Sequence, residues 1–232
     1  LANKQKPLNI WSAACSTGEE AISLFLSAEN FFKETHRFTI YGSDVNMEVL
    51  DHFQRGIYRN NSFREDGLKF HTLVKENSSD QDKSIRIKPE LIKKIHRQNV
   101  NLSCFDQNTF GKLFDLIFLR NTLIYFSSEK RKKIIDSIVD VLEPGGFLFL
   151  SATEMPLISH SELELVETNR TFYFQKKPRA ERVEQMGITE SMLQTIKNEN
   201  VMDTRGEADK VNEKIDSDQI LEYAADKLNN RI

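Results

Sequence analysis

The sequence predicts an α/β fold, in which helices cover a mostly parallel sheet that carries a small antiparallel insert. Two observations indicate this fold class. Short apolar runs alternate with stretches of helical periodicity between Leu8 and Ser151, which is typical of strand–helix–strand units. One stretch inside this region alternates apolar and polar residues instead, as half-exposed antiparallel strands do. The chain has 232 residues, enough for one such domain and an appendage.

The opening unit is a strand, a loop of small residues and a helix. The apolar run Leu8–Ala14 predicts a buried strand, Cys15–Gly18 predicts the loop, and the periodicity from about Glu19 to Lys33 predicts the helix. At the carboxyl end of a central strand, such a unit offers backbone N–H groups to a ligand. The loop contains neither Gly-x-Gly-x-x-Gly nor Gly-Lys-Ser/Thr, so neither a dinucleotide fingerprint nor a triphosphate cradle is expected.

The two acidic residues that open this helix have alternative roles. The spacing of Ser16 and Glu19 fits a capping box, in which Ser16 is the N-cap and Glu19 folds back onto its N–H. Glu20 then has no structural role and can point at a bound ligand. In the alternative, both acids only favour the positive end of the helix.

A second strand is predicted over Phe38–Ser43 and a second helix from about Met47 to Arg55. The strand ends at Asp44, where a carboxylate suits a ribose because it can accept from both sugar hydroxyls. Asp44 could instead cap the helix, but Asn46 can serve as that cap and leave Asp44 free.

The antiparallel insert is predicted at about residues 60–98. Residues 69–74 and 84–88 alternate apolar and polar side chains on either side of a polar loop, which indicates a hairpin. Such an insert can bind a partner or be an ordinary surface hairpin.

The rest of the domain repeats the same pattern. A helix capped by Ser127 or Ser128 is predicted to end at the Glu-Pro-Gly-Gly run 143–146. The expected strands are the end of a third at 100–102, a fourth buried strand at 114–119, a fifth at 147–151, and a closing hairpin of 162–166 and 171–175.

Arg120 and Asn121 follow the buried fourth strand. Polar groups at the end of such a strand are costly unless they are paired. They therefore form either a buried structural ion pair or the wall of a site.

The composition changes after Lys177. All 16 Phe and the single Trp precede this point, and the polar stretch 178–232 cannot close a core of its own. We therefore predict one domain over 1–177, followed by a linker and an amphipathic helix at about 217–229, with a further C-terminal domain as a possible continuation.

Charge, hydropathy and cysteine content limit which other classes of function are expected. The net charge is −3 with interspersed signs, so nucleic acid is not expected as a partner. No apolar run approaches the roughly 20 residues that span a bilayer, and no secretion leader is recognised, so no direct membrane insertion is expected. Cys15 and Cys104 have no metal-ligand spacing, and both are expected to be buried in a cytoplasmic protein.

Three stretches together resemble the CheR-type chemotaxis receptor methyltransferases: 12–20 (SAACSTGEE), 42–46 (GSDVN) and 118–126 (FLRNTLIYF). Residues 56–58 and 100–102 also fall where that family has them. The resemblance covers about 8–175. It implies a Rossmann-like class I S-adenosylmethionine (SAM) methyltransferase sheet whose insert is the family's β-subdomain.

The resemblance also implies roles for individual residues. The backbone of Ala14, Ser16 and Gly18 would approach SAM, Glu20 would hold its methionine end, and Asp44 would take the ribose hydroxyls. The adenine would lie between Asn101 and Leu102, and the methyl-donor side would be lined by Leu119, Arg120 and Asn121. The implied catalytic residues are Arg120 and Tyr125, and no metal is implied.

The implied reaction transfers a methyl group from SAM to glutamate carboxylates in the cytoplasmic domain of a methyl-accepting chemotaxis receptor, and yields S-adenosylhomocysteine. The family has a small helical domain before the first strand, and this sequence begins at that strand, so the activity of the chain as given is left open. Two alternatives remain: a SAM-binding regulator without catalysis, and a small-molecule methyltransferase on the same fold.

Overall fold

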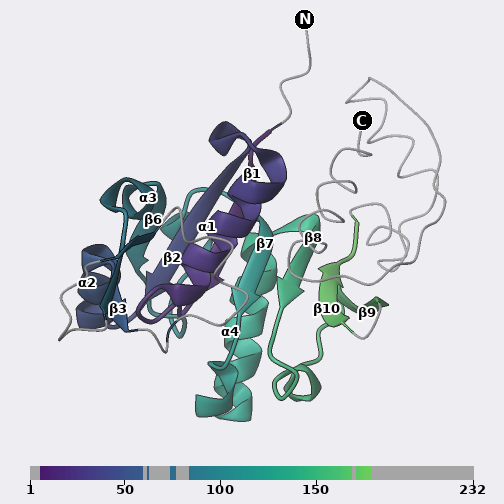
Figure 1. Cartoon of the computed structure of the whole chain (residues 1–232). Coiled ribbons are helices and arrows are strands. Elements are labelled where there is room, and N and C mark those ends of the chain that lie inside the picture. Colours follow the sequence, from purple (N-terminus) through teal and green to yellow (C-terminus); the bar gives the residue numbers. More distant parts are fainter. Residues whose placement is uncertain (1–5, 60–61, 63–73, 77–83, 169–170, 179–232) are drawn as a thin grey trace, which may run out of the picture.

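The computed structural model describes residues 6–59, 62, 74–76, 84–168 and 171–178. Within these residues the main sheet has seven strands in the order β6-β2-β1-β7-β8-β10-β9, so β6 and β9 form its two edges (Figure 1). The strands are β1 (Leu8–Ala13), β2 (Phe38–Asp44), β6 (Ile95–Asn99), β7 (Phe114–Leu119), β8 (Leu142–Phe149), β9 (Leu163–Thr168) and β10 (Thr171–Lys176).

The five strands from β6 to β8 are parallel, whereas β10 runs antiparallel to both β8 and β9. The chain builds the sheet outward in two directions, with β2 and β6 on one side of β1 and β7 and β8 on the other. The boundary between β1 and β7 is therefore the topological switch point, where open α/β sheets bind their ligands. This arrangement confirms the predicted fold class.

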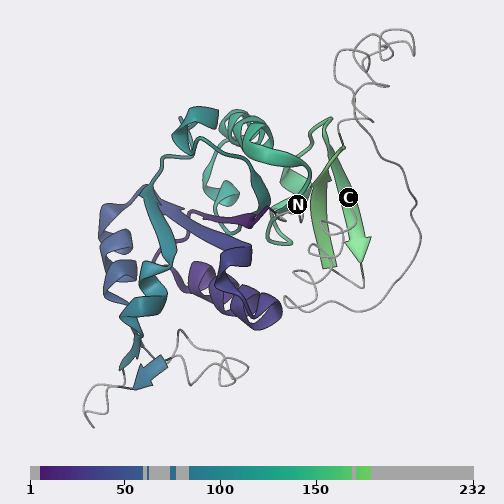
Figure 2. The ribbon, with the colours of Figure 1, turned by 90° about the horizontal axis from the view of Figure 1, so that it is seen from above.

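Helices cover both faces of the sheet. Helices α1 (Glu19–Phe32) and α2 (Met47–Arg55) pack on one face, and α4 (Ser128–Val141) packs on the other (Figure 2). Consecutive residues of β1 show this division, because Ile10 lies in the core beneath α1 and Trp11 in the core beneath α4. Both faces of the central strands are thus buried, which explains their continuous apolar runs.

The observed bounds agree with the predicted ones for most of these elements. Helix α1 ends one residue before the predicted Lys33, and Ser127 is the residue that caps α4. The strand β8 differs, because it begins at Leu142 rather than Phe147. Gly145 takes a positive φ of 77°, and the pairing of β8 with β7 shifts register, so the Glu-Pro-Gly-Gly run stays within the strand as an irregularity.

The insert is a three-stranded antiparallel sheet in the order β3-β5-β4. Its strands are β3 (Ile57–Arg59), β4 (Val74–Glu76) and β5 (Ser84–Ile87), so β3 adds a strand that the predicted hairpin lacked. The short helix α3 (Pro89–Lys93) then leads into β6. Most of the first predicted hairpin strand, 69–73, lies outside the described residues.

The sequence placed residues 95–98 in the insert and the end of the third strand at 100–102. Both predictions are wrong, because residues 95–99 form β6 of the main sheet and this strand ends at Asn99. The reason is physical. An edge strand is partly exposed, and β6 (IHRQN) has Ile95 as its one apolar residue, so no apolar run marks it as a strand of the main sheet. The predicted linker and C-terminal helix lie outside the described residues, since 179–232 are not described. In the part of the chain that is described, no helix is long and apolar enough to cross a membrane.

Candidate functional site

The residues predicted to bind a ligand gather at the carboxyl-terminal ends of the parallel strands of the main sheet. Ala13, the last residue of β1, pairs with Ser43 of β2 and with Leu119 of β7. Asp44, at the end of β2, pairs with Asn99 of β6. The loops that follow these four strands therefore start side by side at the switch point.

The loop between β1 and α1 has an unusual backbone. Ala14 and Ser16 adopt left-handed conformations with φ of 54° and 50°, which costs on the order of 1 kcal/mol for each non-glycine residue. The loop is held by a bond from the Cys15 N–H to the Ser43 carbonyl at 2.8 Å, and by one from the Gly18 N–H to the Cys15 carbonyl at 2.9 Å. The loop is thus fixed in a conformation that the residues alone disfavour.

The predicted capping box is wrong. The N-cap of α1 is Gly18, with φ of 93° and no side-chain capping bond, so Ser16 lies outside the helix. Glu19 accepts instead from the Thr17 hydroxyl at 2.6 Å. A Cβ on Gly18 would lie 2.3 Å from ring atoms of the buried Phe53, so this glycine is also required for packing of the loop against α2.

Glu20 has structural partners, contrary to the expectation that it would have none. One carboxylate oxygen accepts from the buried Ser12 hydroxyl at 2.7 Å, and the other lies 3.3 Å from Nη1 of Arg120. The side chain of Arg120 is 52% exposed and that of Glu20 is 25% exposed. Arg120 and Asn121 are exposed, so the predicted alternative of a buried ion pair is wrong and the cost of burying their polar groups does not arise.

Asp44 joins the first two loops of the site. Its carboxylate accepts from the Ser16 N–H at 3.0 Å and from the Asn46 N–H at 2.9 Å. Asn46, not Asp44, caps α2 by accepting from the Glu48 N–H. A carboxylate has about four lone-pair sites, so two bonds leave acceptor capacity on both oxygens of Asp44.

The segment after β6 contributes one exposed and one buried residue. Asn101 is exposed, and its side-chain oxygen accepts from the Ser103 N–H at 2.9 Å. Leu102 is buried in the same cluster as Leu119. Asn99, which the sequence did not single out, donates its side-chain amide to the carbonyls of Asp44 and Val45 and fastens this segment to the end of β2.

The segment after β7 is held by a residue that sequence reasoning missed. Glu154, in the loop after β8, is fully buried and accepts from the backbone N–H groups of Asn121 at 2.7 Å, Thr122 at 2.6 Å and Leu123 at 2.7 Å. It also accepts from the hydroxyl and N–H of Ser151. The available signal was an acid shortly after an apolar strand, the same pattern that identified Asp44.

The electrostatic state of Glu154 follows from these contacts. Burial by itself would raise the pKa of this carboxyl. The hydrogen bonds from Ser151, Asn121 and Thr122 outweigh that effect, and the pKa is lower than that of an ordinary glutamate. Glu154 is therefore an anion at neutral pH.

The two cysteines differ in environment. Cys15, in the loop between β1 and α1, is buried as predicted, and burial raises the pKa of its thiol to about 12. Cys104 is exposed, so the prediction that both are buried is wrong for this residue. In the described part of the chain, no group of three or more His, Cys, Asp or Glu side chains could hold a metal ion.

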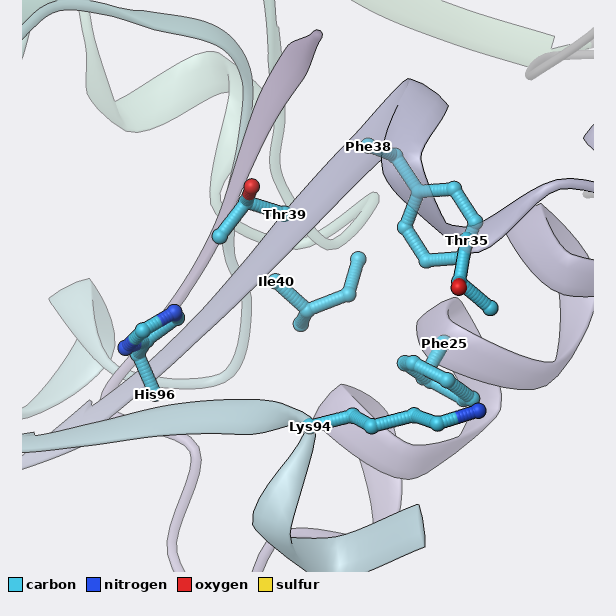
Figure 3. Close-up of a pocket in the computed structure, with 7 residues that line it drawn as sticks. All are labelled: Phe25, Thr35, Phe38, Thr39, Ile40, Lys94 and His96. Atoms are coloured by element: carbon cyan, nitrogen blue, oxygen red, sulfur yellow. The ribbon is translucent and has the colours of Figure 1, made fainter.

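One pocket lies at the other end of the strands. It has a volume of about 240 Å³ and is lined by Phe25, Thr35, Phe38, Thr39, Ile40, Lys94 and His96 (Figure 3). Lys94 lies over the Phe25 ring and pairs with Glu29 at 3.4 Å. The lining comes from the start of β2, from α1 and the turn that joins it to β2, and from the start of β6 and the residue before it. None of these residues is a predicted site residue.

Two relatives illustrate what the chain is similar to. It is 30% identical over 166 residues to the chemotaxis protein methyltransferase of Escherichia coli K12, covering 71% of this chain and 57% of the relative. It is 33% identical over 158 residues to chemotaxis protein methyltransferase 1 of Pseudomonas aeruginosa, covering 66% and 57%. The chain thus spans little more than half the length of these curated relatives.

Among solved structures, the chain is similar to the N-methyltransferase NodS of Bradyrhizobium japonicum in complex with S-adenosylhomocysteine. The TM-score is 0.46 and the identity 14%, and the match covers 74% of this chain and 79% of that one. The CheR methyltransferase SAM-binding domain matches residues 1–172. That match covers more than half of the chain, and it confirms both the resemblance and the cofactor predicted from the motifs. The chain belongs to the CheR methyltransferase family, and this region is the family's SAM-binding domain.

Proposed function

We propose that this protein transfers a methyl group from SAM to glutamate carboxylates in the cytoplasmic domain of chemotaxis receptors, releasing S-adenosylhomocysteine. One observation carries the proposal beyond family membership. Among the described residues, Ala14, Ser16, Asn121 and Lys33 are the non-glycine residues with positive φ, and the first three lie directly after β1 and β7. Such strain is concentrated at functional sites because the surrounding structure must hold it.

The residues at the carboxyl-terminal ends of the parallel strands fit the nucleoside part of SAM. Asp44 retains acceptor capacity for two ribose hydroxyls while its present bonds hold it in place. Leu102 offers an apolar surface beside the exposed polar side chain of Asn101, which suits the face and edge of an adenine. The Ser16 N–H bonds to the Asp44 carboxylate, and in our proposal the cofactor's chain passes along the backbone of Ala14, Ser16 and Gly18 from there.

Glu20 and Arg120 carry the charges that suit the two charged groups of the reactants, which are the ammonium group of the cofactor and the carboxylate of the acceptor. An exposed ion pair of this kind contributes about 0–1 kcal/mol, so its members can change partners at little cost. In our proposal the ammonium group of the cofactor takes the place of Arg120 at Glu20. Arg120 is then available to orient the acceptor carboxylate, and Asn121 lines the same side.

The chemistry requires alignment rather than a proton acceptor. SAM supplies an electrophilic methyl group on a sulfonium. A glutamate with a pKa of about 4.3 is already ionised at neutral pH, so no general base is needed. The protein brings the acceptor anion into line at near-contact distance and excludes water around it. Tyr125 is 81% exposed and so is free to pack against an incoming protein substrate beside the methyl group.

The test is methyl transfer by the full-length protein from radiolabelled SAM to receptor cytoplasmic fragments. Label that alkali releases as methanol, and that is absent when the acceptor glutamates are changed to glutamine, identifies carboxyl methylation. Arg120→Ala should lower turnover about a hundredfold while the dissociation constant for SAM changes less than about threefold. The matched control is Arg37→Ala, whose guanidinium lies over Phe32 beside the opposite end of β2. Tight SAM binding without transfer to any receptor fragment would reject the proposal in favour of a regulator without catalysis.

A further inference from the structure

The Glu154 carboxylate is the buried centre that holds the segment from Arg120 to Tyr125. Three consecutive backbone N–H groups of this segment donate to it, and the described residues include no cationic partner for it. Its side chain is fully buried, so water does not compete for these bonds. The charge of Glu154 is thus stabilised by the backbone that it positions.

The segment needs this support. Asn121 is left-handed with φ of 57°, and Leu123 is fully buried beneath the loop. Removal of the acceptor would leave several partly buried N–H groups unsatisfied, and each such group is costly. The segment would then relax toward other backbone conformations, which would move Arg120 on one side of Asn121 and Tyr125 on the other.

We propose that Glu154 is a positioning residue for methyl transfer: through the backbone of residues 121–123, it sets where Arg120 and Tyr125 stand relative to the reacting groups. The inference rests on the proposed function for its catalytic consequence. Its structural part, that Glu154 holds the backbone of residues 121–123, depends only on the observed hydrogen bonds. Glu154 belongs to the loop after β8, so it also ties that strand's end to the site at the end of β7.

The decisive variant is Glu154→Gln. Glutamine has nearly the same shape, but its amide has a single oxygen acceptor and presents N–H donors to the donors of the segment. Asp115→Asn is the matched control. Asp115 is a buried carboxylate near the amino end of β7, and it accepts from the Asn9 N–H at 2.8 Å. Both substitutions neutralise a buried carboxylate that accepts a hydrogen bond from a backbone N–H, but only Glu154→Gln alters the candidate site.

The experiment measures amide hydrogen exchange, SAM affinity and turnover on the full-length protein. In Glu154→Gln, exchange of the 121–123 amides should accelerate by about tenfold or more. Turnover should fall about a hundredfold, while the SAM dissociation constant changes less than about threefold, as expected when a reacting group is displaced rather than a binding group removed. Asp115→Asn should change none of the three, even where it lowers the melting temperature.

Glu154→Gln with wild-type exchange and wild-type turnover would overturn the inference, and so would equal losses in both variants. If Glu154→Gln fails to fold, Ser151→Ala replaces it, because this change removes one donor to the same carboxylate oxygen that Asn121 uses. It should raise exchange at Asn121 and lower turnover, and unchanged values of both would overturn the inference. Accelerated exchange in a protein whose wild type transfers no methyl would reject the proposed function but support the role of Glu154 in fixing the segment.

Discussion

The hydroxyl of Tyr58 donates to the carbonyl oxygen of Thr17 at 2.6 Å. Tyr58 lies in β3 of the inserted sheet and Thr17 lies in the loop after β1, so this bond joins the insert to the strained loop of the site. Tyr58 is buried, and burial holds its pKa above the usual value, so the hydroxyl remains a protonated donor. We therefore expect a change in the insert to affect the loop that we propose binds SAM.

Tyr58→Phe should therefore weaken SAM binding. Loss of the bond should cost about 1 kcal/mol of folding stability and loosen the loop, raising the SAM dissociation constant about threefold to tenfold. Calorimetric titration measures this change. Tyr41→Phe is the control, because Tyr41 is also buried and its hydroxyl accepts from Lys112 at 2.6 Å away from the loop. A similar loss of stability with unchanged affinity is expected for Tyr41→Phe, and equal effects on affinity would contradict the coupling.

Gly18→Ala should destabilise the fold more than Gly111→Ala. Both glycines have positive φ, 93° and 61°, so both substitutions introduce backbone strain of about 1 kcal/mol. Only at Gly18 would the added Cβ clash, at 2.3 Å from the Phe53 ring, whereas nothing lies within 4 Å at Gly111. Urea unfolding should show an additional loss of about 1–3 kcal/mol for Gly18→Ala. Equal losses in the two variants would show that the packing on Phe53 does not constrain this position.

Cys15 should resist alkylation while Cys104 reacts. Cys104 is exposed, whereas burial raises the pKa of Cys15 to about 12, so almost none of Cys15 is thiolate at neutral pH. Iodoacetamide at pH 7.5 should modify a single site in the folded protein and both in urea. Mass spectrometry of the peptides identifies the site. Rapid modification of Cys15 in the folded state would show that the loop that contains it opens.

Glu154 should contribute to the pH dependence of stability. Its pKa is lower in the folded protein than in the unfolded chain, where it is about 4.3. Its contribution is therefore fully present above the unfolded pKa and is lost as the pH falls through the folded value. Between pH 6 and pH 3.5, the free energy of unfolding measured in urea should fall more for the wild type than for Glu154→Gln. Parallel pH profiles would mean that the folded and unfolded pKa values do not differ.

Local sequence patterns determined the elements of this protein and its family. The apolar run at the start of β1 and the periodicity of α1 report burial along the chain, so they gave the order and most bounds of the elements. The motifs around Gly18, Asp44 and Arg120 pointed to SAM, which the match over residues 1–172 confirms. The pattern failed at β6, since this edge strand has Ile95 as its one apolar residue and so lacks the apolar run that marks the buried strands.

Only the tertiary structure decided how the site is held together. Glu20 and Arg120 are 100 residues apart in the chain, and Glu154 and Asn121 are 33 apart, yet each pair is in contact. The predicted capping box failed because Gly18 is the N-cap of α1, and Ser16 instead gives its N–H to Asp44 at the end of the neighbouring strand. Apolar periodicity depends on one face of one element, whereas a polar group bonds to whichever partner the topology brings within about 3 Å. Those partners can be identified only from the tertiary structure, in which the strands lie side by side.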